Sequence, residues 1–381
     1  MSSSAGTAIA RRVSATPEAL TIEWRAGGAS EFASLWLREN MREDRDAVSG
    51  QRLVDIADLP AAPRIRTVRA DDGRVHIEWE GEARSAAFEL GWLAAQAAGA
   101  AAQRPELGRR LWLEAARLDP RRDFTWVELA SLRAEPRLRL EWLTRLAQDG
   151  LAFLAAVPCD PSTILSAASL IGRVAETNYG LVFDVRSVPQ PENLAYSDLG
   201  LGLHTDNPYR EPVPGFQALH ALVTSPEGGD SLFADGFALA AHLRESAPDA
   251  FRLLTTTAVP FHYRSADAEL YAARPLIQLS CEGEVAAVHY NNRSIRVGAQ
   301  TAPAFYPAYR RFAALLREPR FQLQLKLADG DLVVFDNQRV LHGRTAFTSA
   351  KHPRHLQGCY LTRDSVFSEA GLLRRKLAER T

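Results

Sequence analysis

Two residues that could share one metal ion lie close together in the stretch LGLHTDNPYREPVPG, residues 201–215. His204 and Asp206 are two positions apart, and in an extended strand such residues point to the same face. An imidazole nitrogen and a carboxylate oxygen could therefore reach one ion from a single strand end. A lone pair of this kind more often makes only a hydrogen bond, so by itself it is weak evidence for a metal.

His342 is the later histidine in a matching setting, where the apolar run of GDLVVFDNQRVLHGRTAF passes into a turn. Two histidines and one carboxylate with open coordination positions are the ligand set of non-haem Fe(II) oxygenases. The long segment between Asp206 and His342 can hold the intervening strands of a barrel, so that both ends meet at one mouth. The sequence therefore predicts a metal site made by His204, Asp206 and His342.

The elements that must position these residues are mostly short strands. From residue 176 onwards, strands alternate with Gly- and Pro-rich turns, interrupted by helical patterns at 236–256 and 301–319. Helices are also predicted at 137–150 and 162–175. Many short strands with few strand–helix–strand units favour an antiparallel jelly roll with flanking helices over a doubly wound parallel sheet.

The first part of the chain has a different composition, because all seven tryptophans lie within the first 142 residues. Strands are predicted at 19–25 and 52–56, and a hairpin at 64–80 with the turn signal Asp72-Gly73. At 381 residues, the chain is long enough for two domains. We predict an α+β, mainly β protein, with a small β-rich domain over residues 1–100 and a double-stranded β-helix (jelly roll) domain over residues 101–381.

Composition narrows the classes of function. Hydrophobic residues make up 46% and charged residues 24% of the chain, and the net charge is −1. These values are ordinary for a globular protein and argue against a strongly basic nucleic-acid surface. No apolar run approaches the ~20 residues needed to span a bilayer, and the N-terminus lacks the apolar segment of a signal peptide. We expect a cytoplasmic protein with no nucleic-acid or membrane partner.

Five ordered motifs carry a family resemblance: HTDNPYREPVPG, GGDSLFADGF, HYNNRS, GDLVVFDNQRVLHGRTAF and PRHLQGCY. Together they resemble the γ-butyrobetaine hydroxylase group of Fe(II)- and 2-oxoglutarate-dependent oxygenases, within the taurine/α-ketoglutarate dioxygenase superfamily. The resemblance runs from about residue 137 to the C-terminus. SLWLRENM and GQRLVDIADLP also resemble the small domain that precedes the catalytic one in this group. The family resemblance implies a jelly-roll hydroxylase that uses O₂ and 2-oxoglutarate and releases succinate and CO₂.

The same resemblance implies roles for residues around the cosubstrate. The predicted triad would hold Fe(II), leaving positions for 2-oxoglutarate and O₂. Arg354 matches the family's arginine for the far carboxylate of 2-oxoglutarate, which suits a planar bidentate cation. Arg344 is a second candidate for that role. Ser231 matches a hydroxyl that helps to seat the cosubstrate, although an ordinary turn serine is an equally good interpretation.

Aromatic residues near the motifs indicate the substrate. A quaternary ammonium group donates no hydrogen bond and is recognised by the faces of aromatic rings. Tyr179, Tyr196 and Tyr360 match cage positions of the γ-butyrobetaine enzymes, Phe183 stands where a tryptophan is familiar, and Tyr209 follows the first ligands. Each ring alone is more often core packing, but their joint placement favours a cage for a trimethylammonium group.

The other end of such a substrate is an anion, for which Asn193, Asn207, Asn292 and Arg293 are candidates. Two amides satisfy a carboxylate, whereas a phosphonate favours an added guanidinium. Arg293 directly after Asn292, together with Asn207-Pro208-Tyr209-Arg210 after the iron ligands, resembles the branch of the family that hydroxylates 2-(trimethylammonio)ethylphosphonate. This phosphonate is our predicted substrate, with γ-butyrobetaine as the alternative. Arg293 could equally pair with a surface carboxylate.

A non-catalytic betaine-binding jelly roll and a cupin-like metal protein with other chemistry are more distant alternatives. A cage without iron would need no cosubstrate arginine, so Arg354 favours the enzyme.

One departure from the family concerns a structural zinc in the small domain. Relatives often hold it with three cysteines just after WLRxN and with a later histidine. Here those positions are Met41–Asp46 and Ala83, so thiolate ligands are missing. We expect this domain to be held by its own core, with Trp24, Trp36 and Trp79 as contributors. A role in the contacts of a homodimer or in covering the active site is a hypothesis.

Overall fold

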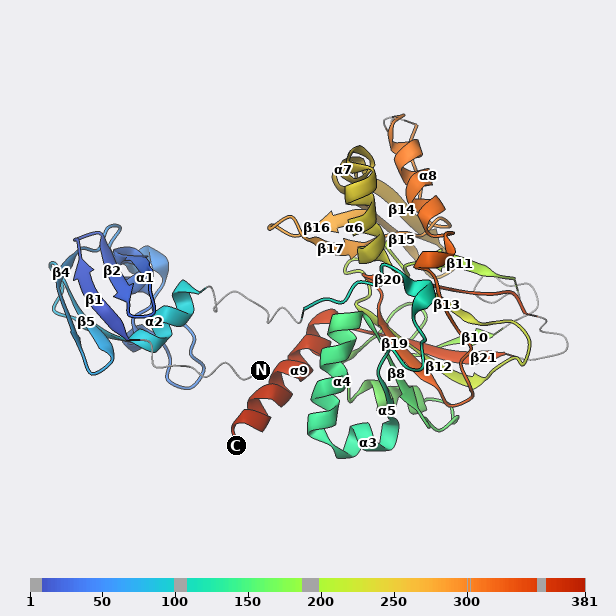
Figure 1. Cartoon of the computed structure of the whole chain (residues 1–381), viewed down its shortest axis with the longest axis horizontal. Coiled ribbons are helices and arrows are strands. Elements are labelled where there is room, and N and C mark those ends of the chain that lie inside the picture. The colour runs from blue at the N-terminus through green and yellow to red at the C-terminus, as the bar shows by residue number, and fades with distance from the viewer. Residues whose placement is uncertain are drawn as a thin grey trace. The chain divides into compact units, whose positions relative to one another are not determined.

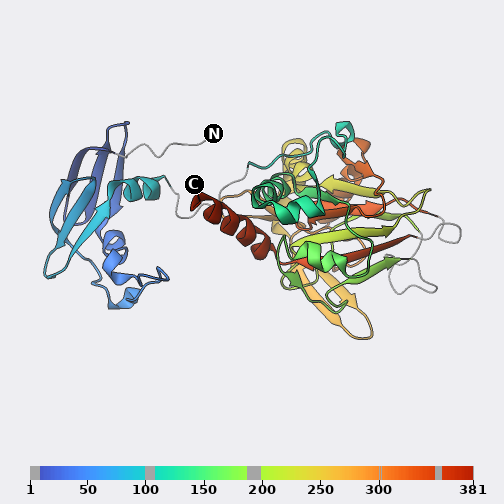
Figure 2. The ribbon, with the colours of Figure 1, turned by 90° about the horizontal axis from the view of Figure 1, so that it is seen from below.

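The computed structural model describes residues 9–98, 108–186, 199–299, 301, 303–347 and 354–380. The chain divides into two compact units, Met1–Glu106 and Leu107–Thr381, and each is described by itself (Figures 1 and 2). Two predicted substrate residues, Asn193 and Tyr196, lie outside the described residues.

Two three-stranded antiparallel sheets form the body of the N-terminal unit. Their strands are β1 (Ala10–Ala15), β2 (Ala19–Trp24) and β3 (Ala29–Ala33), and β4 (Ile65–Asp71), β5 (Arg74–Trp79) and β6 (Ser85–Glu89). Short helices follow β3 and β6, namely α1 (Ser34–Glu39) and α2 (Leu90–Ala97). The predicted hairpin is present as β4 and β5, and both turn residues, Asp72 and Gly73, have positive φ.

The core of this unit follows the two-residue period of its strands. On β5, Val75, Ile77 and Trp79 are fully buried. Trp24 and Trp36 are only partly buried and pack against that core. The prediction of a strand at 52–56 is wrong. In this segment, Arg52 makes an isolated β-bridge with Arg45, and a 3₁₀ turn follows at Ile56–Asp58.

A cluster of paired charges lies in and next to the segment Met41–Asp46. Arg38 Nη1 donates to Asp44 Oδ2 at 2.7 Å, and Arg84 Nη2 donates to Asp44 Oδ1 at 2.5 Å. Arg38 Nε donates to Glu82 Oε2 at 3.0 Å. Burial raises the pKa of Asp44, but its bonds to Arg84 and Arg38 outweigh that effect and hold the pKa below its usual value. These ion pairs join the segment after α1 to the turn between β5 and β6.

Two antiparallel sheets face each other in the larger unit. One has seven strands in the order β10-β21-β12-β19-β8-β7, with β9 beside β21, and the other has four in the order β11-β20-β13-β18. Among the described strands of these two sheets, only β7 and β8 pair in parallel. The strands of the large sheet are β7 (Trp126–Glu128), β8 (Leu151–Ala155), β9 (Val174–Ala175), β10 (Phe183–Arg186), β12 (Phe216–Val223), β19 (Leu332–Asp336) and β21 (His355–Leu361). Those of the small sheet are β11 (Leu201–His204), β13 (Ser231–Asp235), β18 (Leu323–Leu325) and β20 (Val340–Arg344).

The space between these sheets is filled by side chains from both. Phe233 on β13 and Leu323 on β18 pack in one buried cluster with Phe335 on β19 and Leu356 on β21. Two antiparallel sheets closed over a shared core are the jelly roll that the sequence predicted.

Helices cover the outer face of the large sheet. These are α3 (Leu129–Ala134), α4 (Pro136–Asp149), α5 (Thr163–Ala168) and α9 (Arg363–Ala378), and α4 lies beside α9 (Figure 1). Trp142 of α4 and Val366 of α9 share a buried cluster with Phe216 and Val334 of the sheet.

A second group of elements packs around a separate buried cluster. It contains α6 (Gly236–Ser246), α7 (Pro248–Thr256), α8 (Phe305–Leu315) and the hairpins β14 (Val259–Arg264)–β15 (Glu269–Arg274) and β16 (Ile277–Leu279)–β17 (Val285–Val288). Within the described ranges, no helix is both long and apolar enough to cross a bilayer.

Helix predictions succeed where an end signal is present. Gly150 ends α4 with φ +74°, and a Cβ there would lie 3.0 Å from the Arg339 side chain. The prediction at 162–175 is too long, since only Thr163–Ala168 is helical and the last two residues join the large sheet as β9. The pattern at 236–256 is two helices, because Pro248 starts α7 afresh.

Candidate metal centre

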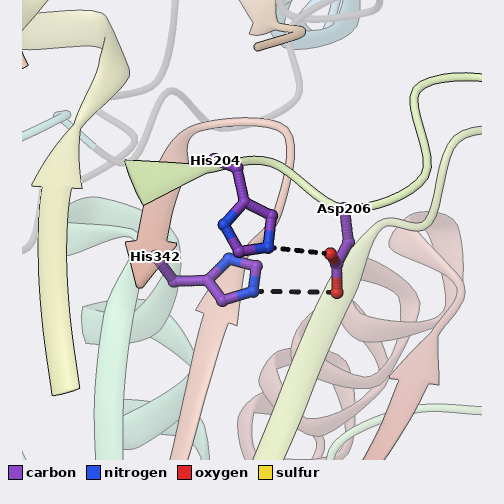
Figure 3. A group of neighbouring side chains, drawn as sticks. All are labelled: His204, Asp206 and His342. Carbon is purple, nitrogen blue, oxygen red and sulfur yellow. Dashed lines mark ion pairs between the residues drawn. The ribbon is translucent and has the colours of Figure 1, made fainter. Parts of the chain in front are cut away.

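Three predicted ligands meet at one end of the small sheet. His204 ends β11, and its cross-strand partner is His342 on β20. Asp206 follows β11 by two residues, and its carboxylate faces both rings (Figure 3). The distances are 3.2 Å from His204 Nε2 to Asp206 Oδ1 and 3.7 Å from His342 Nε2 to Asp206 Oδ2. One ligand atom from each residue lies within 4.8 Å of the others, and no other such group occurs in the part of the chain that the structure describes.

Neighbouring polar groups fix the orientation of these ligands. His204 Nδ1 lies 2.9 Å from the Gly202 carbonyl oxygen, and donation to that oxygen leaves Nε2 as the free donor of a lone pair to a metal. The Asp206 N–H donates to Asn337 Oδ1 at 2.7 Å, and Asn337 Nδ2 donates to the carbonyl oxygens of Asp206 at 3.0 Å and Pro214 at 3.2 Å. Asn337 therefore ties the ligand loop to the turn between β19 and β20.

Asn337 lies in the stretch GDLVVFDNQRVLHGRTAF, and no role is predicted for it from the sequence. Its full burial in a turn explains its hydrogen bonds, since such a side chain must bond to neighbouring backbone.

The electrostatics of the three ligands suit a divalent cation. Burial raises the pKa of Asp206, but the imidazoles and a hydrogen bond of 2.8 Å from the Tyr360 hydroxyl to Oδ2 hold it well below its usual value. Burial and the neighbouring His204 lower the pKa of His342 to about 3. The carboxylate is thus anionic and the His342 ring neutral near pH 7, and these are the states that bind a metal. The donor set fits Fe(II) with open positions.

A cavity with about 790 Å³ of open space, including its mouth, adjoins the triad. Ser231, Arg344 and Arg354, predicted for the cosubstrate, all line it and are all buried. Ser231 and Arg344 are cross-strand partners on β13 and β20. Gly229 leaves room for the Arg354 side chain, because a Cβ at position 229 would lie 2.9 Å from Arg354 Cδ. Burial and the neighbouring Arg344 lower the pKa of Arg354 to about 10. Two guanidinium groups in one enclosed space suit a dicarboxylate ligand.

Aromatic rings form another wall of the cavity, made by Tyr179, Phe183 and Tyr360. The ring centroids of Phe183 and Tyr360 are 5.1 Å apart, and those of Tyr179 and Phe183 are 6.3 Å apart. Tyr360 also donates to Asp206, so one side chain joins this wall to the metal ligands. Gly358 leaves room for Phe183, because a Cβ there would lie 2.3 Å from that ring.

Polar residues predicted for the substrate divide into two groups. Asn207 and Arg293 line the cavity, and each has a buried nitrogen, Nδ2 and Nη1, with no hydrogen-bond partner among the described residues. Tyr209 and Asn292 do not line it. Tyr209 is buried and donates to Asn207 Oδ1 at 2.7 Å, while Asn292 is exposed and accepts a bond of 2.6 Å from Tyr309. Placing Asn292 at the substrate is therefore not supported by its position.

Gln217 is a cavity residue that sequence reasoning missed. It lies on β12, is buried, and has no partner for Oε1 in the described part of the chain. The available signal was an amide in the strand segment FQALHALV, in which His220 is the other polar residue. Phe216, next to Gln217, faces the opposite side and packs in the helix-covered core.

Comparison with known proteins adds to this geometry. The family described as "Taurine catabolism dioxygenase TauD, TfdA family" matches residues 116–360. A gamma-butyrobetaine dioxygenase of Pseudomonas sp. (strain AK-1) is 38% identical over 370 residues, covering 93% of this chain and 94% of that protein. The human gamma-butyrobetaine dioxygenase is 28% identical over 377 residues, covering 94% of this chain and 95% of that protein. A trimethyllysine dioxygenase of Meyerozyma guilliermondii is 27% identical over 380 residues, covering 93% of this chain and 94% of that protein.

Among solved structures, an asparagine oxygenase in complex with Fe(II), 3-hydroxyasparagine and succinate matches with a TM-score of 0.51 and 19% identity. The match covers 66% of this chain and 84% of that one. It supports the jelly-roll fold of the larger unit.

Proposed function

Because this chain belongs to the TauD/TfdA family of dioxygenases, we propose that it hydroxylates a small trimethylammonium zwitterion, and that this substrate is γ-butyrobetaine. The enzyme is a 2-oxoglutarate-dependent dioxygenase that uses Fe(II) and O₂. The observation that carries the proposal is the 38% identity to a gamma-butyrobetaine dioxygenase over 93% of this chain. Succinate and CO₂ would be the co-products.

The chain's own residues would divide the work of holding the reactants. His204, Asp206 and His342 would hold Fe(II), which together with 2-oxoglutarate and O₂ supplies the oxidation of a C–H bond. Arg354 would bind the far carboxylate of 2-oxoglutarate from its buried position, with Arg344 and Ser231 beside it.

The substrate would lie between the aromatic wall and the polar residues of the cavity. Tyr179, Phe183 and Tyr360 would face the trimethylammonium group, because ring faces attract a cation that donates no hydrogen bond. Asn207 and Arg293 offer unpartnered nitrogens to the anionic end, as judged within the described residues. The predicted roles of Tyr196 and Asn193 stay predictions, since both lie outside the described residues.

A second candidate is 2-(trimethylammonio)ethylphosphonate, which the sequence reasoning placed first. The observation in its favour is Arg293, whose guanidinium lines the cavity with a buried and unpartnered Nη1 among the described residues. A phosphonate carries more charge than a carboxylate and gains more from a guanidinium. The relatives nevertheless support γ-butyrobetaine better.

A turnover screen tests the proposal. Oxygen-dependent succinate formation is measured with γ-butyrobetaine, the phosphonate, trimethyllysine and the unmethylated amine of each. We expect the largest kcat/KM with γ-butyrobetaine and poor turnover of every unmethylated amine. Better turnover of the unmethylated amines would overturn the trimethylammonium proposal, and a preference for the phosphonate that disappears in Arg293→Gln would establish the second candidate.

The homodimer and the cytoplasmic location stay predictions from the sequence. Light scattering on the purified chain measures the first, and cell fractionation measures the second. Removing the N-terminal unit and measuring both oligomeric state and turnover tests whether this unit makes dimer contacts or covers the active site.

A further inference from the structure

Tyr209 does not contact the cavity that its position in the sequence suggested. Its side chain is buried, it is absent from the cavity lining, and its ring stacks on Tyr263 with centroids 5.0 Å apart and planes 16° apart. Its hydroxyl donates to Asn207 Oδ1 at 2.7 Å. Tyr209 therefore lies behind Asn207, a residue that lines the cavity.

Asn207 is held in an unusual conformation directly beside a metal ligand. It follows Asp206, is buried, and has φ +53°, in the left-handed region that asparagine tolerates better than most other side chains. Its backbone carbonyl accepts a bond from the Arg210 N–H at 3.1 Å, which closes a turn. The side chain is thus fixed at the wall of the cavity.

The two ends of the Asn207 amide have different surroundings. Oδ1 has a donor in Tyr209, whereas the buried Nδ2 has no partner among the described residues. A buried N–H needs an acceptor, and the cavity is the space that Asn207 lines. With Oδ1 bound to the hydroxyl behind it, the amide presents its N–H groups to the cavity; with Oδ1 released, it could turn and present its oxygen instead.

We propose that Tyr209 is a positioning residue, which orients the Asn207 amide so that Nδ2 donates to the anionic end of the substrate. The inference rests on the proposed function, because it needs a substrate with an anionic group beside the metal ligands. The hydroxyl sets the direction of the amide, and the stacked Tyr263 ring holds the hydroxyl in place.

A second tyrosine–asparagine pair in the same unit provides the matched control. Tyr309 donates to Asn292 Oδ1 at 2.6 Å, which is the same chemistry, but neither residue lines the cavity. Tyr309→Phe removes one hydroxyl from the same kind of pair at a place where no substrate contact depends on it.

The test measures substrate binding and steady-state kinetics of the full chain. Binding of γ-butyrobetaine and of the phosphonate is followed by anaerobic calorimetry on protein loaded with Mn(II) and 2-oxoglutarate. Tyr209→Phe keeps the ring stack and should weaken binding of whichever zwitterion the wild type binds by roughly three- to tenfold, about what one hydrogen bond contributes. KM for that zwitterion should rise in parallel, while KM for 2-oxoglutarate and the binding of Mn(II) stay unchanged. Tyr309→Phe should match the wild type.

A double-mutant cycle shows whether the effect passes through Asn207, since the Tyr209 hydroxyl also interacts with Tyr179. In an Asn207→Ala background, Tyr209→Phe should have no further effect on binding. The positioning role would be overturned if Tyr209→Phe bound the zwitterion as tightly as the wild type does. It would also be overturned if Tyr209→Phe lost as much affinity in the Asn207→Ala background as in the wild type. Either result would leave the proposed function standing. Binding of neither zwitterion to the wild type would overturn both.

Discussion

Buried polar groups have opposite surroundings in two regions of this molecule. In the N-terminal unit, the carboxylate of Asp44 is bonded by Arg38 and Arg84, and Arg38 also binds Glu82. Around the cavity of the larger unit, Asn207, Arg293 and Gln217 each have a buried polar atom without a partner in the described residues. Both arrangements are enclosed, so burial alone does not separate them.

This contrast separates buried polar groups that stabilise the fold from those that can bind a ligand. A buried charge whose hydrogen bonds are all made within the protein holds that part of the chain together. Removal of its partner leaves the charge buried and unpaired, which lowers the stability of the fold. A buried donor or acceptor that faces a cavity without a partner is satisfied only when something binds. Substitutions in the first region should therefore change stability, and those in the second should change binding and turnover.

The largest expected effect is on the metal ligands. His204→Ala and Asp206→Ala should each lower succinate formation by more than about a hundredfold, which is the upper end for disturbing a group that only orients a ligand. The measurement is Fe(II)-dependent succinate release together with Mn(II) affinity by calorimetry. His76→Ala, in the N-terminal unit, is the control and should leave both unchanged. Unchanged turnover in either ligand variant would defeat the assignment of the metal site.

The next largest effect is expected from substituting Arg354, the proposed cosubstrate arginine. Arg354→Gln removes a buried guanidinium and should raise KM for 2-oxoglutarate by roughly 30-fold or more, since loss of one partner of such a pair costs about 2–5 kcal/mol. Initial rates at varied 2-oxoglutarate measure it. Arg66→Gln, which removes an exposed pair with Glu78, is the control. If the rise is seen with Arg344→Gln and not with Arg354→Gln, the second candidate for this role is the correct one.

The N-terminal charge cluster should show the opposite response. Asp44→Asn leaves Arg38 buried with a weaker partner and should lower the free energy of unfolding of this unit by about 3 kcal/mol. Urea unfolding followed by tryptophan fluorescence measures the change. Asp71→Asn breaks a surface pair with Arg69 and should change the free energy of unfolding by at most about 1 kcal/mol. Equal midpoints for both variants would remove the contrast between the two regions.

The smallest effect is a dependence on pH. Because the pKa of Asp44 is lower in the folded chain than in the unfolded one, its contribution to stability is full above the unfolded value of about 3.9 and is lost as the pH falls through the folded value. The difference in unfolding free energy between wild type and Asp44→Asn should thus be constant near pH 7 and shrink below about pH 4. A difference that grows on acidification would show that the sign is wrong.

The candidate metal ligands could be predicted from the sequence, but Asn337, which holds their loop, and the cavity residue Gln217 could not. His204 and Asp206 are suggested by residue type and a two-residue spacing, and the later motif with His342 completes the set. Asn337 and Gln217 depend on which strands become neighbours and which face is inside, since β12 pairs with β19 and β21 over long sequence separations. One-dimensional patterns contain the period of a strand but not its partners.

Neighbouring residues in turns show the same limit of sequence reasoning. Arg293 reaches the cavity while the adjacent Asn292 is exposed and bonded to Tyr309. Tyr209 was expected to face the substrate but packs behind Asn207. The direction of a side chain in a turn is set by the local backbone and by tertiary contacts, and neither can be read from residue types alone.

The fate of molecular oxygen in the reaction with γ-butyrobetaine tests the proposed hydroxylation most directly. The enzyme, Fe(II), 2-oxoglutarate and γ-butyrobetaine are incubated under ¹⁸O₂, and the products are analysed by mass spectrometry. We expect one ¹⁸O atom in succinate and one in the hydroxylated trimethylammonium product, with both products formed in equal amounts. Succinate that forms at the same rate with and without γ-butyrobetaine, and no labelled hydroxylated product, would contradict the proposed hydroxylation.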